Sequence, residues 1–181
     1  MVQLPLKHGF SSSRWRECTD AVLEKIPGQP KLEKMRIIML FEADFNYMLK
    51  LVWGWRLVHR AEDEKLLGHS QHASRPGRQC TDACLEKLLL YEHALLTWTS
   101  MITVDNDARS CYDWIIKTAA MILCIAIGLP LMAAIAHNKT HHGMRHRIKT
   151  RHGSSKKSYQ ISDYKPMKGT GQGSGGSPAI C

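Results

Sequence analysis

The chain has 181 residues, of which 44% are hydrophobic and 23% are charged. This length suits one ordinary domain, and this composition excludes an intrinsically disordered chain. The formal net charge of +9 is unevenly distributed, because residues 1–100 hold 14 Lys and Arg against 12 Asp and Glu, whereas residues 101–181 hold 11 against 4. A local excess of positive charge is typical of a surface that binds a polyanion.

The first ten residues lack the apolar core of a secretory signal, and no C-x-x-C pair occurs. We therefore expect an intracellular, reduced protein, in the nucleus or the cytoplasm, whose thiols are small buried apolar groups. The six thiols belong to Cys18, Cys80, Cys84, Cys111, Cys124 and Cys181.

The spacing of apolar residues in the first hundred residues predicts mainly helices. Apolar side chains recur at helical spacing over residues 11–26, 43–67 and 79–96. Residues 34–42 form a short apolar run that predicts a buried strand, and the Ser, Pro and Gly content of residues 69–78 predicts a loop.

The second part of the chain alternates between apolar and polar segments. Residues 98–104 predict a strand that runs into a cluster of acidic and amide side chains at residues 105–107. Residues 115–127 and 131–148 predict two helices, separated by a Gly-Leu-Pro break, and short strand-like pieces follow near residues 159–164. Residues 169–178 are rich in glycine, a composition that by itself indicates a flexible linker.

Residues 118–136 carry no charge and are followed by basic residues, which is also the pattern of a membrane span. Gly128 and Pro130 interrupt the segment, and its alanines lower its hydrophobicity. We expect a pair of buried core helices here, and a small membrane protein with a span at 118–136 is the alternative.

Asp107 follows the predicted strand, where a carboxylate can either hold a divalent metal ion or cap the next helix. Residues 107–113, D-A-R-S-C-Y-D, resemble the first aspartate motif of non-LTR retrotransposon reverse transcriptases, D-x-x-x-A-F/Y-D. The resemblance implies that Asp107 is the catalytic metal ligand and Tyr112 the steric gate that excludes ribonucleotides. It makes Asp113 a structural residue of the motif.

Three further segments match motifs of the same family, and their order along the chain is the expected one. Residues 71–83 resemble the block Q-x-G-F-R-x-G-R-S-x-x-D-A, which assigns nucleotide binding to Arg75 and Arg78. Residues 169–178 align with G-x-R-Q-G-x-x-x-S-P, the loop under the templating base pair, through Gln172 and Gly173. The weaker match of residues 34–38 to K-x-R-P-I would place Arg36 at the nucleotide triphosphate.

The resemblance implies an α+β fold, with fingers-like helices in residues 1–100 and a partial palm sheet in residues 101–181. The implied activity is RNA-directed DNA synthesis for a retrotransposon, with magnesium as cofactor and RNA template, DNA primer and dNTP as partners. The family's F/Y-x-D-D hairpin is not found, because no adjacent Asp pair occurs in the sequence. We therefore expect a reverse-transcriptase fragment, truncated before the catalytic hairpin and without a thumb, that is inactive alone.

Two other interpretations concern the basic segment. Residues 137–168 carry nine Lys and Arg against one acid, so a basic nucleic-acid-binding module without catalysis is an alternative function. His137 and His141, like His142 and His146, have a spacing that could present two imidazoles to one zinc ion. No cysteine or carboxylate lies near them in the sequence, so a zinc site is not expected.

Overall fold

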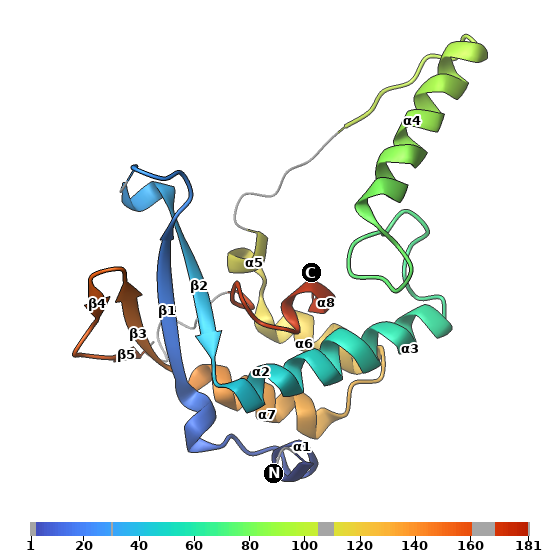
Figure 1. The fold of residues 1–181 in the computed structure, drawn as a ribbon. Helices are drawn as coiled ribbons and strands as arrows, with labels where there is room; N and C mark the ends of the chain where they lie inside the picture. Colours follow the sequence, from blue (N-terminus) through green and yellow to red (C-terminus); the bar gives the residue numbers. More distant parts are fainter. Residues whose placement is uncertain (1–2, 30, 105–110, 161–168, 181) are drawn as a thin grey trace.

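The computed structural model describes residues 3–29, 31–104, 111–160 and 169–180. It is a mixed α+β fold, as the sequence predicts, with one small sheet and a layer of helices packed against it (Figure 1). Strands from the first and the last third of the chain meet in this sheet, so residues 1–100 and 101–181 share one core.

The sheet has the order β2-β1-β3-β4, and β5 also pairs with β3. Strand β1 (Glu17–Glu24) is antiparallel to β2 (Met35–Phe41) and parallel to β3 (Arg145–Thr150). Two short strands, β4 (Gly153–Ser154) and β5 (Tyr159–Gln160), run antiparallel to β3. The predicted strand at residues 34–42 is therefore confirmed as β2.

Two predicted helices are partly wrong, because segments of them form strands. Residues 11–26 were expected to be helical, but they form only the short 3₁₀ helix η1 (Ser13–Arg16) before β1. The predicted helix at 131–148 ends as α7 (Leu131–His142), and its basic end becomes β3. Both segments gain hydrogen-bonded neighbours that are distant in the sequence, and such pairing overrides local spacing.

The central helical layer confirms the prediction for residues 43–67. Helix α2 (Ala43–Leu49), the π-helical segment η3 (Lys50–Leu57) and α3 (Val58–Asp63) follow one another without a break. They bury one face against the sheet and α7. The largest core side chains are aromatic, aliphatic and thioether groups: Trp15, Phe41, Phe45, Met48, Leu49, Trp53, Leu57, Met121, Leu129 and Met144.

Helices α6 (Lys117–Ala126) and α7 complete the core and confirm the predicted helix pair with a break at residues 127–130. The short N-terminal helix α1 (Gln3–His8) packs on α7. Among the helices of the described ranges, none has the length and apolar character that a membrane crossing requires.

Helix α4 (Cys80–Leu96) confirms the predicted helix at 79–96 but extends away from the sheet and core (Figure 1). Its N-terminus has a capping box formed by Gln79 and Asp82, and none of its residues is buried. The strand predicted at residues 98–104 is wrong, since this segment pairs with no strand and Ile102 is 91% exposed. The remaining elements are short: η2 (Leu32–Lys34), α5 (Cys111–Trp114) and α8 (Ser177–Ile180).

Candidate functional site

The glycine-rich segment from Gly169 to Ser177, here called the glycine loop, is folded between two other sequence motifs. Its backbone bonds to α5 through Gly169 N–H to the Ile115 carbonyl and Thr170 N–H to the Tyr112 carbonyl, each 2.9 Å long. On its other side the Met39 N–H of β2 donates to the Gln172 carbonyl at 2.7 Å. The loop thus covers the free edge of β2 and joins this strand to α5.

Close packing explains why this loop needs glycine. Gly173 has a φ of +105°, and a Cβ atom there would lie 2.5 Å from the Met39 carbonyl oxygen. Gly171 has a φ of +79°, and its Cβ would lie 2.7 Å from the Met39 sulfur. Both the backbone conformation and the available space exclude larger residues.

Side chains close the loop from both sides. The Ser177 hydroxyl is within 3.0 Å of the Thr170 carbonyl and 2.9 Å of the Gly171 carbonyl. Asn46 of α2 accepts a 2.7 Å hydrogen bond from the Gly175 N–H. These contacts contradict the flexible-linker interpretation that composition alone suggests.

The residues assigned by resemblance are only partly brought together. Tyr112 is half-buried, and its carbonyl accepts a hydrogen bond from Thr170 of the glycine loop, two residues before Gln172. Arg36 is exposed at the far end of β2, three residues from the contact with the loop. Asp107 lies outside the described residues, and so does the side chain of Asp113.

The predicted nucleotide-binding arginines lie in the loop before α4. Arg75 is engaged within the chain, because its guanidinium forms two hydrogen bonds to the Glu62 carboxylate, at 2.8 and 2.7 Å, and reaches the Gly68 and Gln71 carbonyls. The hydrogen bond to Glu62 raises the pKa of Arg75. Arg78 is half-buried nearby, and its charge helps to lower the pKa of Glu62.

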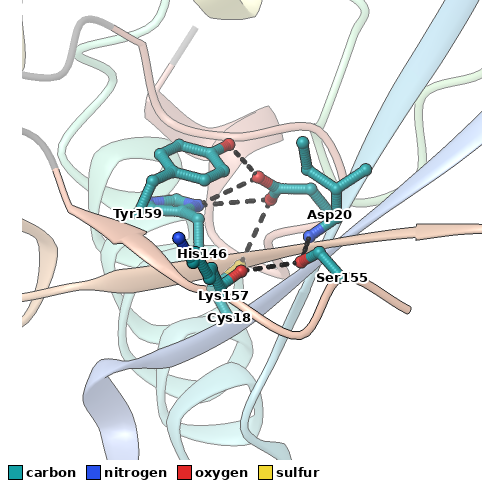
Figure 2. Close-up of polar contacts among 7 residues, drawn as sticks. Cys18, Asp20, His146, Ser155, Lys157 and Tyr159 are labelled. Carbon is teal, nitrogen blue, oxygen red and sulfur yellow. Dashed lines mark hydrogen bonds and ion pairs between the residues drawn. The ribbon is translucent and has the colours of Figure 1, made fainter.

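A second polar site, which the sequence analysis did not predict, lies on the inner face of the sheet. Cys18, Asp20, His146 and Tyr159, here called the buried polar cluster, meet on the inner faces of β1, β3 and β5 (Figure 2). Asp20 is the centre: His146 Nδ1 is 3.2 Å from both of its carboxylate oxygens, the Cys18 thiol is 3.7 Å from Oδ1, and the Tyr159 hydroxyl donates to Oδ2.

Burial and hydrogen bonding set the charge states of this cluster. Burial tends to raise the pKa of Asp20, but the hydrogen bonds from His146 and Tyr159 outweigh it, and the net pKa is lowered. Burial, together with the negative charge of Asp20, raises the pKa of the Cys18 thiol and of the Tyr159 hydroxyl. The lowered pKa favours an ionised Asp20 carboxylate, which accepts hydrogen bonds from its neighbours.

His137 and His141 do lie on one face of α7, as their spacing predicts, but this face is in the core. Their rings are 4.4 Å apart and pack against Phe45. Burial, followed by the positive charge of Lys117, lowers the pKa of His137 to about 3. Burial also lowers the pKa of Lys117, to about 8, and its amine is 3.4 Å from His141 Nδ1.

Among the described residues, one group of three possible metal ligands lies close together, namely Cys18, Asp20 and His146. Its thiol and imidazole are not the oxygen ligands that magnesium favours. This group therefore does not match the magnesium that the resemblance implies, and the residue assigned to magnesium, Asp107, lies outside the described residues. A search with models of known protein families finds no match to the chain, and a search of curated proteins finds none either.

Proposed function

We propose that the chain is a fragment of a reverse-transcriptase-like polymerase that binds primer and template but does not catalyse synthesis alone. The observation that carries the proposal is the junction of three motifs. The glycine loop, the strand with Arg36 and the helix with Tyr112 are far apart in the sequence, yet backbone hydrogen bonds connect them. The resemblance assigns the loop to the templating base pair and Tyr112 to the steric gate, so the contact between these two segments supports the proposal.

We predict that the chain is inactive because the matched motifs supply too few carboxylates for a two-metal site. Two-metal nucleotidyl transfer requires several acidic oxygens around the reacting phosphate, and one carboxylate does not hold two magnesium ions against their hydration. The resemblance supplies Asp107 alone, and the sequence has no adjacent Asp pair. Magnesium, when bound, would stabilise charge on the phosphate, while this chain's own contribution is to hold primer and template beside the glycine loop.

The second candidate, a basic nucleic-acid-binding module, is favoured by the outer face of the sheet. Arg145, Arg147 and Lys149 alternate along β3 and are exposed. Glu17 pairs with Arg145, whereas Arg147 and Lys149 have no ion-pair partner within the described part of the chain. Arg147 and Lys149 line a hollow of about 630 Å³ whose other charged lining residues are Arg14, Glu17 and Glu42. Such a surface would bind phosphates without base selection.

Photocrosslinking distinguishes the two functions by the place where the primer end binds. A DNA primer with 5-iodouracil at its 3′ end is annealed to an RNA template, bound to the chain at low salt and irradiated. For a polymerase fragment we expect crosslinked peptides that contain Tyr112 or residues 169–177. The Gln172→Ala variant should lower the crosslink yield, while Gln29→Ala, in the turn between β1 and β2, should not.

Crosslinks confined to residues 145–157 would support the basic module instead and refute the polymerase assignment. A complete lack of binding at low salt would refute both. Primer extension is measured in the same samples with magnesium and dNTP, and we expect none. Extension of the primer would contradict the predicted inactivity, and Asp107→Asn should then abolish it.

A further inference from the structure

The buried polar cluster has the composition and placement of a metal site. Cys18 and Asp20 are two residues apart on β1, so both side chains point to the same face of the sheet. His146 is the direct partner of Cys18 in the parallel pairing of β1 with β3. The exposed fractions of these residues are 3%, 4% and 2%, so a thiol, a carboxylate and an imidazole converge in an enclosed place (Figure 2).

We propose that Cys18, Asp20 and His146 bind one zinc ion through Sγ, Oδ1 and Nδ1. The distances between these atoms fit a tetrahedral ion. With ordinary zinc bond lengths and tetrahedral angles, a sulfur and an oxygen ligand lie about 3.6 Å apart, and a nitrogen and an oxygen ligand about 3.4 Å. The observed separations are 3.7 Å from Cys18 Sγ to Asp20 Oδ1 and 3.2 Å from His146 Nδ1 to the same oxygen.

The surroundings provide the support that a metal ligand needs. Tyr159 donates to Oδ2 of Asp20, which orients the carboxylate, and Oδ1 lies near both the Cys18 thiol and His146 Nδ1. The Tyr159 ring stacks on His146 and is 46% exposed, so it lies between the cluster and solvent. In the metal-free chain His146 Nδ1 donates its hydrogen bond to Asp20, while Nε2 is buried without a hydrogen-bond partner among the described residues, so metal binding requires the ring proton to move from Nδ1 to Nε2.

The charges of the ligand set match a divalent ion. Binding releases the proton of the Cys18 thiol, and His146 gives up its Nδ1 proton and binds as a neutral imidazole with its ring proton on Nε2. One thiolate and one carboxylate then neutralise Zn²⁺, and the fourth position is open to water. A mixed sulfur, nitrogen and oxygen set selects zinc over magnesium or calcium. Because the thiol proton must leave, the affinity should fall as the pH is lowered.

Cobalt(II) tests the site, since a cobalt–thiolate bond gives an intense near-ultraviolet charge-transfer band. Titration of the full chain should give this band with one equivalent of cobalt, and zinc should displace it. Cys18→Ser should abolish the band. Tyr159→Phe should keep the band and weaken binding by about 10–100-fold, because it removes only the orienting hydrogen bond.

The matched control is the double variant Cys80→Ser, Cys84→Ser, which removes two exposed thiols on α4 that could bind cobalt adventitiously. It should retain the band at one equivalent. A band that survives in Cys18→Ser, or that is lost in the control, would overturn the proposal. So would a wild-type chain that gives no band, since Cys18, Asp20, His146 and Tyr159 would then form a hydrogen-bonded network without metal.

X-ray absorption of the zinc-loaded wild-type chain tests the same site without any variant that could misfold. We expect one sulfur and two or three nitrogen or oxygen neighbours around each zinc ion. A spectrum with nitrogen and oxygen neighbours alone would exclude Cys18 as a ligand.

Discussion

At the scale of single residues, the most unusual environment is that of the two histidines on consecutive turns of α7. His137 is 2% exposed and contacts the rings of Phe45, His141 and Trp53, the last at a ring distance of 4.9 Å. Its Nδ1 atom has no hydrogen-bond partner, so only the neutral ring is compatible with this position. A fall in pH should therefore destabilise the folded chain, because His137 is protonated only after unfolding.

We predict that the free energy of unfolding decreases as the pH falls below 6.5. The folded-state pKa of His137 is about 3, below the ordinary value of 6.5, so the unfolded chain takes up a proton that the folded chain does not. The contribution to stability is fully present above pH 6.5 and is lost progressively down to about pH 3. For each proton that the chain takes up on unfolding, the free energy of unfolding falls by about 1.4 kcal/mol per unit decrease in pH.

Urea denaturation at pH 7, 6, 5 and 4 measures this slope. His137→Phe, which keeps a ring in the core, should lower the slope by one proton, whereas His69→Gln, in an exposed loop, should leave it unchanged. An unaltered slope in His137→Phe would show that this residue is not the acid-sensitive group.

At the scale of elements, the glycine loop is the segment whose sequence is most strictly determined by its neighbours. We predict that Gly173→Ala lowers the free energy of unfolding by roughly 2–4 kcal/mol, from left-handed strain and overlap with the Met39 carbonyl. Gly77 has a φ of +70°, but a Cβ atom there would meet no other atom within 4 Å. Gly68 has neither a positive φ nor a close neighbour.

Variants of Gly77 and Gly68 serve as controls that separate the effect of backbone strain from that of steric overlap. Gly77→Ala should cost roughly 1–2 kcal/mol from backbone strain alone, and Gly68→Ala should change the stability by less than about 0.5 kcal/mol. Chemical denaturation of the three variants measures these differences. A Gly173→Ala variant as stable as Gly68→Ala would show that the loop does not pack against β2 as described.

The sequence predicts β2 correctly because a short run of Ile, Met and Leu is typical of a buried strand, and it predicts α2 to α3 from helical spacing. It fails for β1, because Trp15, Cys18, Val22 and Ile26 also have helical spacing. The strand forms there because β2 and β3 pair with both of its edges, and the pairing with β3 depends on residues more than 100 positions away.

Because β1 was predicted to be a helix, the buried polar cluster was not predicted either. On a helix, Cys18 and Asp20 would point in different directions, whereas on a strand they share a face. His146 was placed on a helix with His142, and its position on β3 is not visible in a basic segment with few apolar residues. The alternation Cys-x-Asp was the available signal, but it indicates a shared face only once the segment is known to be a strand.

At the scale of the whole molecule, helix α4 adds a large apolar surface that the core does not cover. Leu88 and Leu95 are 53% and 76% exposed and lie two turns apart on one face of the helix. Exposed apolar surface of this kind promotes association. We predict that the chain self-associates at high concentration and that Leu88→Lys with Leu95→Lys shifts it towards the monomer.

Sedimentation velocity over a range of concentrations measures this association. The control variant, Thr81→Lys with His93→Lys, adds two lysines to exposed positions of α4 without removing the leucines. It should associate nearly as strongly as the wild type. Equal loss of association in both variants would mean that added charge, not the leucine surface, is responsible.

The parallel pairing of β1 with β3 has a consequence for how the chain is made. Asp20 and His146 are 126 positions apart in the sequence, so the central strand leaves the ribosome long before its second neighbour is synthesised. Contacts between such distant residues form slowly, because a long loop must close first. The hairpin of β1 and β2 must therefore wait with an unpaired β1 edge and with Asp20 in water until β3 is made, and the sheet is complete only after the short strands β4 and β5 have also been translated.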